Sequence, residues 1–320
     1  MLLRVRPFLL KCLSTASALL VISLLTFALV KLSSVNPEEN YLRLSKISLS
    51  QEAIQEAEHY LGLDKPWWQQ YGIWLSRVLR GDFGQSYLLK RPVLPLVLER
   101  FGTTSLLAFC AFVLIVLVST PIGIWSGLHE GSHLDSVVRL LTFSSVSLPS
   151  FWVAYLLILL FSVKLNWLPS SRGQEANSLI LPSITLSFSL IGQYIALIRK
   201  AISEQARSLH VENARLRGVK QSYLIQNHLL RNALPAPVTA MSLSFVYLLT
   251  GSIIVEEVFS WNGIGRLFIM SLRAYDLPVI QACMLLFGTL FLLNNLVTQC
   301  LVSWIDPHLR QTKEVPCQND

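Results

Sequence analysis

The segment RKAISEQARSLHVENARLRGVKQSYLIQNHLLRNALPAP, residues 199–237, lies between two long uncharged runs of a 320-residue chain. It contains seven Lys or Arg residues and only two acidic ones, Glu204 and Glu212. Short cationic loops of membrane proteins remain in the cytoplasm, so the charge of this segment predicts that it faces the cell interior. This orientation then fixes the direction in which the apolar runs on either side cross the membrane.

The composition is that of a membrane protein. Hydrophobic residues make up 52% of the chain and charged residues 14%, with a mean hydropathy of +0.52, whereas soluble domains carry about 25% charged residues. The net charge of +7 lies in loops beside apolar runs, where membrane topology explains it, so no nucleic-acid partner is expected. Five cysteines without paired spacing predict neither a disulfide framework nor a metal site.

Six uncharged runs predict an all-α, polytopic protein with six transmembrane helices. Each run can supply the roughly 20 residues that a helix needs to cross a bilayer. An even number of spans places both termini on one side, and basic residues near both ends place that side in the cytoplasm, as expected for a multi-pass protein of the cytoplasmic (inner) membrane. The runs cover residues 12–30, 101–128, 140–163, 176–198, 232–255 and 277–305.

The first run has an alternative interpretation as a cleaved signal peptide, because a basic start precedes it. No small-x-small cleavage site follows the run, which favours a retained first helix.

Residues 31–100 form the one large segment predicted outside the cell. An amphipathic helix is expected over 48–63, capped by Ser50 and ended by Gly62. A second helix follows Pro66, and its tryptophans favour a position at the membrane interface, with an aromatic ligand platform as the alternative. Two glycines in residues 81–86 predict a tight turn.

Prolines inside three apolar runs, at Pro121, Pro149 and Pro182, predict bent helices. None of the six runs has a charged residue in its interior, unlike proton relays and ion-coupled carriers. The energy for any transport is therefore expected to enter from elsewhere.

Thr185, Ser189 and Gln193 recur every four residues in the fourth run and share one helical face. Two interpretations remain open. The three side chains line a passage for a polar solute, or they form the hydrogen bonds between helices that small polar residues commonly provide in bilayers, and the second is favoured.

Motifs of catalysis are absent from the sequence. It contains no HExxH, no GxSxG and no GxxxxGK[ST], so neither an enzyme active site nor ATP hydrolysis on this chain is predicted, and no cofactor is expected. His129 and His133 have a metal-binding spacing but lie in a short polar turn, which favours a solvated loop. Glu256 and Glu257, the paired acids near a span end, are expected in a surface turn.

Within residues 199–237 the pattern predicts two helices joined by a glycine. Residues 201–216 lack Gly and Pro, Gly218 ends that helix, and a second helix over 222–232 precedes Pro235. Such a projecting pair suits docking into a groove of a partner, with apolar anchors and with Glu212 facing a partner cation. A basic loop held against anionic lipid headgroups is the alternative.

The residues Glu212-Asn213-Ala214, Gly218 and HLLRNALP (228–235) resemble the EAA loop of permease subunits of ABC importers, in the branch for dipeptides, oligopeptides and nickel. Asn213 replaces the second alanine of the motif, while Glu212, Ala214 and Gly218 keep their spacing. The landmarks GDFGQS (81–86), VSLPSFW (146–152) and EEVFSWNGIGR (256–266) extend the resemblance over nearly the whole chain.

This resemblance implies a type I ABC importer permease fold. A transmembrane helix and an external loop would occupy residues 1–100, a permease core 101–306 and a cytoplasmic tail 307–320, with the coupling (EAA) loop at about 199–233. The implied partners are a second homologous permease forming a heterodimer, two cytoplasmic ATPases and an extracytoplasmic solute-binding protein. The resemblance assigns ATPase coupling to Glu212, Ala214, Arg217 and Gly218.

Short motifs also suggest a substrate. The stretches YLRLS (41–45), LGLDKPW (61–67) and ARLRG (214–218) are most similar to nickel permeases, so nickel or a nickel–metallophore complex is predicted, with dipeptides or oligopeptides as the alternative. No cluster of metal ligands lines a run, and a chelated metal would need none because its chelator already satisfies it.

Overall fold

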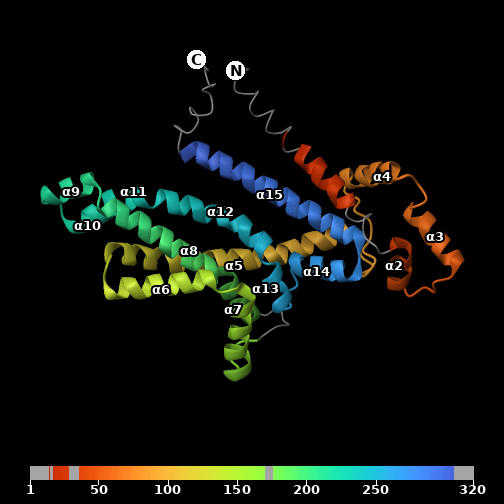
Figure 1. Ribbon diagram of the computed structural model, residues 1–320, viewed down its shortest axis with the longest axis horizontal. Coiled ribbons are helices and arrows are strands. Elements are labelled where there is room, and N and C mark those ends of the chain that lie inside the picture. The colour runs from red at the N-terminus through yellow and green to blue at the C-terminus, as the bar shows by residue number, and fades with distance from the viewer. Residues whose placement is uncertain (1–13, 15–16, 29–35, 170–175, 306–320) are drawn as a thin grey trace, which may run out of the picture. The chain divides into compact units, whose positions relative to one another are not determined.

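The computed structural model describes residue 14 and residues 17–28, 36–169 and 176–305. Apart from one isolated β-bridge between Gln85 and Pro92, these residues form only helices, turns and irregular segments, so the predicted all-α class is confirmed (Figure 1). The basic residues of the N-terminus, the charged loop at 170–175 and the tail at 307–320 lie outside the described residues. Two compact units can be separated.

Each predicted apolar run coincides with an apolar helix or a pair of helices. Among the described residues, three helices are long and apolar enough to cross a membrane: α5 (Val93–Leu128), Asn177–Ala206, which contains α8 (Ile180–Ala206), and the first part of α15 (Leu277–Ile305). Two bent pairs raise the number to five if each crosses once, and Ser17–Ala28 is a shorter apolar helix. The described helices are consistent with six spans.

The two bent pairs differ in how sharply they turn. The first joins α6 (His133–Ser147) to α7 (Ser150–Leu157) and the π-helix η1 (Ile158–Lys164), with an angle of 105°. The second joins Gln221–Ala233 to α12 (Pro235–Gly251), with an angle of 48°.

The first unit comprises residues up to Thr103 together with Asn262–Leu296. Its helices are α2 (Pro37–Leu44), α3 (Gln51–Leu61), α4 (Trp67–Leu79), the start of α5, α14 (Ile264–Ala274) and most of α15. The two helices predicted within residues 31–100 are confirmed as α3 and α4. Local signals fix α3, because Ser50 accepts a hydrogen bond from the Ala53 amide at 3.2 Å and Gly62 adopts a φ of +69°.

Helix α5 begins at Val93, about ten residues before the predicted start of the second span near Thr103. Val93, Leu96 and Val97 are fully or almost fully buried in the core of this unit. Their spacing gives the first turns one apolar face, while Glu99 stays exposed. The charges at Glu99 and Arg100 end the uncharged run without ending the helix.

A buried carboxylate organises the corner between α14 and α15. Asp276 accepts hydrogen bonds from the Ser86 hydroxyl at 2.5 Å and from the amides of Tyr87 and Leu88 at 3.0 and 3.1 Å. Burial and the nearby Asp276 charge raise the pKa of Tyr87. The turn predicted at 81–86 is confirmed by positive φ angles at its two glycines, and Asp276 holds the chain that follows it.

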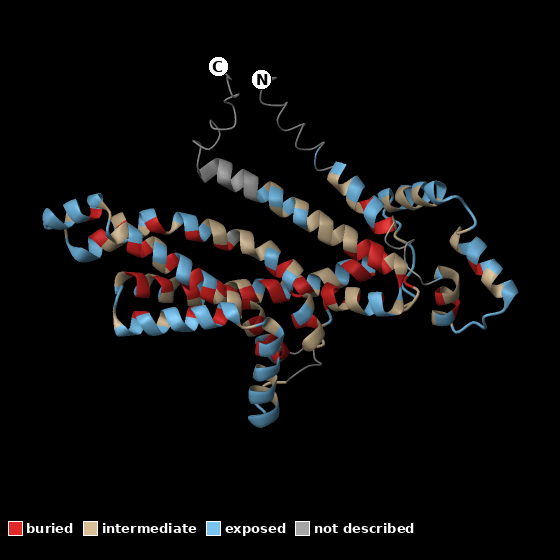
Figure 2. Cartoon of the chain, in the orientation of Figure 1, coloured by how far each residue is buried: buried red, intermediate tan, exposed pale blue. Residues whose placement is uncertain are grey.

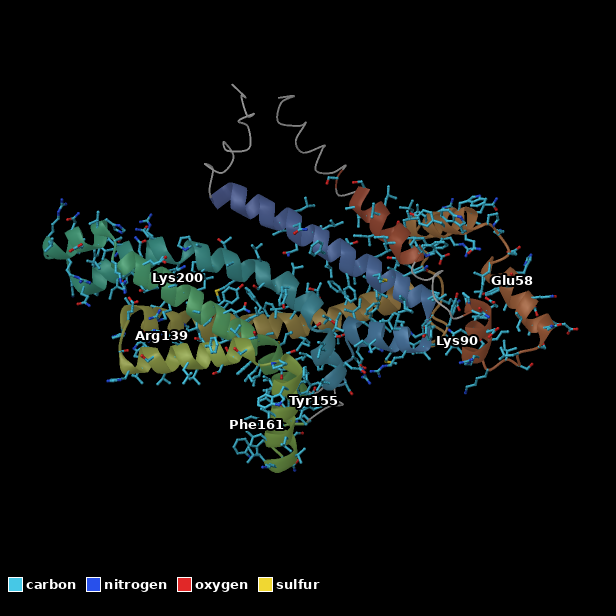
Figure 3. All side chains as sticks on the ribbon, viewed as in Figure 1. Glu58, Lys90, Arg139, Tyr155, Phe161 and Lys200 are labelled. Carbon is cyan, nitrogen blue, oxygen red and sulfur yellow. The ribbon has the colours of Figure 1, made fainter. Side chains whose placement is uncertain are left out.

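The second unit comprises Thr104–Trp261 and residues from Val297 onward, and α8 lies at its centre. Twelve of the 27 residues of α8 are buried, and the helix contacts α6, α7 and α12 (Figure 2). By contrast, α7 and η1 keep large apolar side chains exposed, among them Tyr155 at 59% (Figure 3). Much of α8 is therefore buried in this unit, while α7 and η1 expose a large apolar surface.

Glycines permit close approach of helices to α8. A Cβ added at Gly123 would lie 2.7 Å from Ile198 Cβ, and one at Gly127 would lie 2.7 Å from Ile202 Cβ. On another side of α8, a Cβ at Gly192 would lie 3.0 Å from the Thr142 carbonyl oxygen of α6. Small residues at such contacts are typical of membrane helix pairs.

The three prolines behave differently from one another. Pro149 lies at the 105° bend between α6 and α7, as predicted. The interpretation of Pro182 as a bend inside a span is wrong, because Pro182 lies in the first turn of α8, where its missing amide would have no helical partner anyway. Pro121 lies inside α5, which continues as one helix through it.

Glu256 is also placed differently from the prediction. Its side chain is fully buried in α13 (Ile253–Val258) rather than in a surface turn. The carboxylate accepts hydrogen bonds from the hydroxyls of Thr104 at 2.6 Å and Ser252 at 2.8 Å. Glu256 therefore belongs to the packed interior of this unit.

Candidate coupling segment and solute pathway

The predicted single helix over 201–216 is divided at Ser208. Helix α8 ends at Ala206, and α9 (Leu209–Leu216) begins after Ser208, whose φ of −72° and ψ of 146° are extended. The Ser208 hydroxyl donates to the Gln205 carbonyl at 2.6 Å, while the Ser208 carbonyl accepts from the amides of Val211 and Glu212. Ser208 thus ends one helix and starts the next, a competition with helical bonding that serine commonly offers.

The end of α9 is fixed by Gly218, as predicted. Gly218 has a φ of +75°, and its amide donates to the Arg215 carbonyl at 3.0 Å. The Val219 amide donates to the Ala214 carbonyl at 3.2 Å. These two bonds form a Schellman motif, in which a left-handed residue satisfies the last helical carbonyls.

Helix α9 presents a mixed apolar and charged surface. Leu209 is 77% exposed and Leu216 is 80% exposed, at the two ends of the helix. Glu212, between the two leucines in sequence, and Arg217, directly after Leu216, are both exposed. Ala214 is half-buried and Val211 is buried. The four residues predicted for coupling, Glu212, Ala214, Arg217 and Gly218, therefore lie together on this short helix and its cap.

His210 connects α9 to the elements on both sides of it. Its Nε2 lies 2.9 Å from the amide nitrogen of Gln205 and 3.3 Å from that of Asn232. Both side-chain amide nitrogens are donors, so Nε2 is the acceptor in these two contacts. The predicted second helix, over 222–232, is confirmed as α10 (Gln221–Tyr223), the π-helix η3 (Leu224–Leu230) and α11 (Arg231–Ala233).

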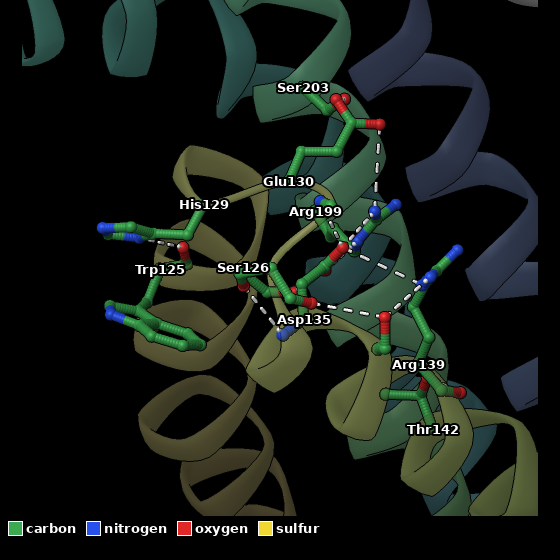
Figure 4. A network of polar contacts seen from close by, with 12 residues as sticks. Trp125, Ser126, His129, Glu130, Asp135, Arg139, Thr142, Arg199 and Ser203 are labelled. Carbon is green, nitrogen blue, oxygen red and sulfur yellow. Dashed lines mark hydrogen bonds and ion pairs between the residues drawn. The ribbon is translucent and has the colours of Figure 1, made fainter.

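A cluster of charges that the sequence interpretation missed lies at the end of α8 (Figure 4). Asp135, from the first turn of α6, receives two hydrogen bonds from Arg199, Nε to Oδ1 at 2.6 Å and Nη2 to Oδ2 at 2.7 Å. The Asp135 carboxylate also accepts from the Ser126 hydroxyl at 2.5 Å and from the Gly131 amide at 3.0 Å. Its side chain is fully buried, and that of Arg199 is 16% exposed.

Glu130 adds a second contact between the α5–α6 turn, residues 129–132, and α8. Its Oε2 accepts from the Ser203 hydroxyl at 2.5 Å and from Arg207 Nη2 at 2.6 Å. The Ser203 hydrogen bond and the Arg207 guanidinium hold the pKa of Glu130 below its usual value. The sequence held a signal for this cluster, because acids in the second loop and bases after the fourth run fall on the same side of the predicted topology.

The three candidate pathway residues have graded exposure along α8. Thr185 is buried and its hydroxyl donates to the Leu181 carbonyl at 2.9 Å within the same helix. Ser189 is half-buried, and Gln193 is exposed. Within the described part of the chain, none of the three forms a hydrogen bond to another helix, and no group of three or more His, Cys, Asp or Glu side chains converges.

Comparisons with known proteins agree with this architecture. The profile of the family "Binding-protein-dependent transport system inner membrane component" matches residues 119–311, and the profile of its N-terminal part matches residues 4–108. The glutathione transport system permease protein GsiC of Pectobacterium atrosepticum is 36% identical over 95% of this chain and 98% of its own length. A putative peptide transport system permease of Brucella abortus is 34% identical over 91% of this chain and 95% of its own length.

A solved structure shares the fold. The MetNI methionine ABC transporter, in an inward-facing conformation, matches 64% of this chain and 96% of the other chain with a TM-score of 0.50 at 15% identity. The profile matches and the relatives together cover most of the chain. The protein belongs to the inner membrane component family of binding-protein-dependent transport systems, the permease subunits of ABC importers.

Proposed function

We propose that this chain is one of the two permease subunits of an ATP-driven importer of glutathione or short peptides. The observation that carries the proposal is the similarity, at 34–36% identity over 91–95% of the chain, to permeases named for glutathione and peptide transport. These relatives favour peptides over nickel, the substrate predicted from short motifs. Nickel or a nickel–metallophore complex becomes the alternative outcome of the uptake test.

The proposed assembly has this chain beside a second homologous permease in the inner membrane. Two ATPase subunits bind on the cytoplasmic face, where ATP is hydrolysed, and an extracytoplasmic binding protein delivers the solute. Both termini and the coupling loop at about 199–233 face the cytoplasm. The supporting features are the positive charge of this loop and the absence of a nucleotide-binding motif from the chain.

Helix α9 is the proposed contact with the ATPase. Leu209 and Leu216 supply exposed apolar anchors, Glu212 and Arg217 supply charges at the rim, and the Gly218 cap holds the helix end. An apolar helix face rimmed by charges is the usual form of a helix that docks in a groove. Substituting Leu216 by Asp is expected to abolish uptake because it places a carboxylate in that groove.

Gln193 and Ser189 are the proposed contacts with solute. They lie one turn apart on α8, and their exposure contrasts with the buried Thr185, whose hydroxyl is already bonded within the helix. An amide and a hydroxyl suit a polar organic solute such as a peptide backbone better than a bare metal ion.

The test is uptake by a deletion strain that carries this chain on a plasmid. Radiolabelled glutathione, a dipeptide and nickel are supplied separately, and the strain with an empty plasmid gives the background. Restored uptake of glutathione or dipeptide with unchanged nickel accumulation supports the proposal. Restored nickel uptake alone would assign the protein to the nickel importers instead.

A further inference from the structure

The last two turns of α8 and the C-cap residue that follows them carry three polar side chains on one face. Arg199, Ser203 and Arg207 are four residues apart in sequence, so they follow one another along the helix. Two carboxylates meet them: Asp135, in the first turn of α6, binds Arg199, and Glu130, in the α5–α6 turn, binds both Ser203 and Arg207. Figure 4 draws Asp135 and Glu130 beside Arg199 and Ser203. Arg207 immediately precedes Ser208, the N-cap residue of α9.

The Asp135 contact differs from an ordinary surface ion pair. Its carboxylate is fully buried and is held by donors from three places: Ser126 at the end of α5, the Gly131 amide in the turn, and Arg199 in α8. A bidentate guanidinium–carboxylate pair fixes both distance and orientation. Removing one partner leaves a buried charge uncompensated, so the pair is costly to separate.

A neighbouring pair on the same helix shows the contrast. Lys200 and Glu204 lie 3.7 Å apart with side chains 71% and 67% exposed (Figure 3). Exposed ion pairs of this kind contribute little to the stability of the fold, because water screens the two charges and both side chains are mobile. Lys200 therefore provides a matched control beside Arg199.

Close backbone packing accompanies the ionic contacts. A Cβ at Gly127 would lie 2.9 Å from the Arg199 carbonyl oxygen and 2.7 Å from Ile202 Cβ. The end of α5 thus fits against α8 without space between them. Packed in this way, the end of α5 and the end of α8 have little room to slide past each other.

From these contacts we propose that the α5–α6 turn is a second part of the coupling element. Asp135 and Glu130 clamp it to the end of α8, so that a displacement of α9 moves the ends of α5, α6 and α8 together. Asp135, Glu130 and Arg199 are positioning residues in this proposal, which rests on the proposed docking of α9 to an ATPase. The clamp converts a push on one short helix into a movement of three longer helices.

The test uses the complete importer in proteoliposomes, with its binding protein and ATPases, and measures solute imported per ATP hydrolysed. Asp135→Asn and Arg199→Gln are expected to lower this ratio about tenfold, within the range typical of coupling between sites. ATP hydrolysis and subunit assembly are expected to persist, which a purely structural defect would not allow. Lys200→Gln, the matched control, is expected to leave the ratio unchanged.

A cross-link tests the clamp directly. In a variant without native cysteines, Glu130→Cys and Ser203→Cys together remove the second contact, and a short thiol cross-linker then replaces it. The ratio is expected to fall in the uncross-linked variant and to recover after cross-linking. This variant decides the question if Asp135→Asn fails to assemble.

Two results would overturn the clamp. One is an assembled Asp135→Asn importer with an unchanged ratio, and the other is a cross-linked importer that hydrolyses ATP but no longer transports, since the turn would then have to separate from α8. Failure of the proposed docking looks different, because Leu216→Asp would then leave ATP-driven uptake intact.

Discussion

Gly218 is selected by backbone conformation alone. Its φ is +75°, and a Cβ added to it would meet no atom within 4 Å. Adopting this left-handed conformation costs an ordinary L-residue about 1–2 kcal/mol of conformational free energy. The cost is lower for asparagine, because its side chain can form a local hydrogen bond. Helix α9 has only eight residues, too few to be stable alone in water, so this cost is expected to loosen its end.

The uptake rates of Gly218 variants should therefore follow how well each new residue adopts a positive φ, and not the size of its side chain. Gly218→Asn is expected to keep most of the uptake rate, whereas Gly218→Val is expected to lose most of it, because β-branched residues tolerate positive φ worst. Initial uptake rates in the complemented deletion strain, normalised to the amount of membrane-inserted protein, provide the measurement. Equal rates for the two variants would show that the cap does not limit coupling.

At the scale of elements, α5 packs closely against α8 at Gly127. A Cβ there would lie 2.7 and 2.8 Å from two atoms of Ile202, which branches next to the backbone and cannot turn away. Gly127→Ala is thus expected to destabilise the protein by about 1–3 kcal/mol, as overpacking usually does. The measurement is the melting temperature of the purified protein in detergent.

Gly102, in the same helix, is the matched control. It has nothing within 4 Å of an added Cβ, so Gly102→Ala is expected to leave the melting temperature unchanged or to raise it slightly, since alanine favours helix by about 0.5–1 kcal/mol over glycine. A melting temperature equally low for both alanine variants would point to a general need for glycine in α5.

Elements with local signals could be predicted from the sequence, and elements set by tertiary packing could not. The Ser50 cap and Gly62 mark the ends of α3, Gln51–Leu61, inside the predicted stretch 48–63, because both act on neighbouring backbone groups. The start of α5 at Val93 was missed because Glu99 and Arg100 end the uncharged run while the helix continues. The break at Ser208 was missed because serine is only weakly unfavourable inside a helix.

In the candidate site, too, features set by adjacent residues could be predicted, and contacts set by tertiary packing could not. Charge density locates the coupling segment, and Gly218 marks the end of its helix, because both are properties of adjacent residues. The pairing of Asp135 with Arg199 joins residues 64 positions apart, so it depends on how α6 packs on α8. Counting charges by loop could suggest that the two lie on one side of the membrane, but not that they touch.

At the scale of the whole molecule, the number of membrane crossings decides which way α9 faces. Between Tyr60 in α3 and Leu216 in α9, the chain passes through α5, the bent pair formed by α6 with α7 and η1, and α8. Helices α5 and α8 are long and apolar enough to span, whereas the pair bends by 105°, a geometry shared by broken spans and re-entrant loops. Three crossings place Tyr60 and Leu216 on opposite faces, and two place them on the same face.

We expect three crossings, because the positive charge of residues 199–237 favours the cytoplasm, whereas residues 32–100 carry eight basic and eight acidic residues and so have no net charge. In a variant without native cysteines, Tyr60→Cys should react with a membrane-impermeant thiol reagent in intact spheroplasts, and Leu216→Cys only after permeabilisation. Burial limits neither reaction, since Tyr60 is 73% and Leu216 80% exposed. Reaction of both in intact spheroplasts would make the bent pair re-entrant and place α9 beyond the reach of any ATPase, which would contradict its coupling role.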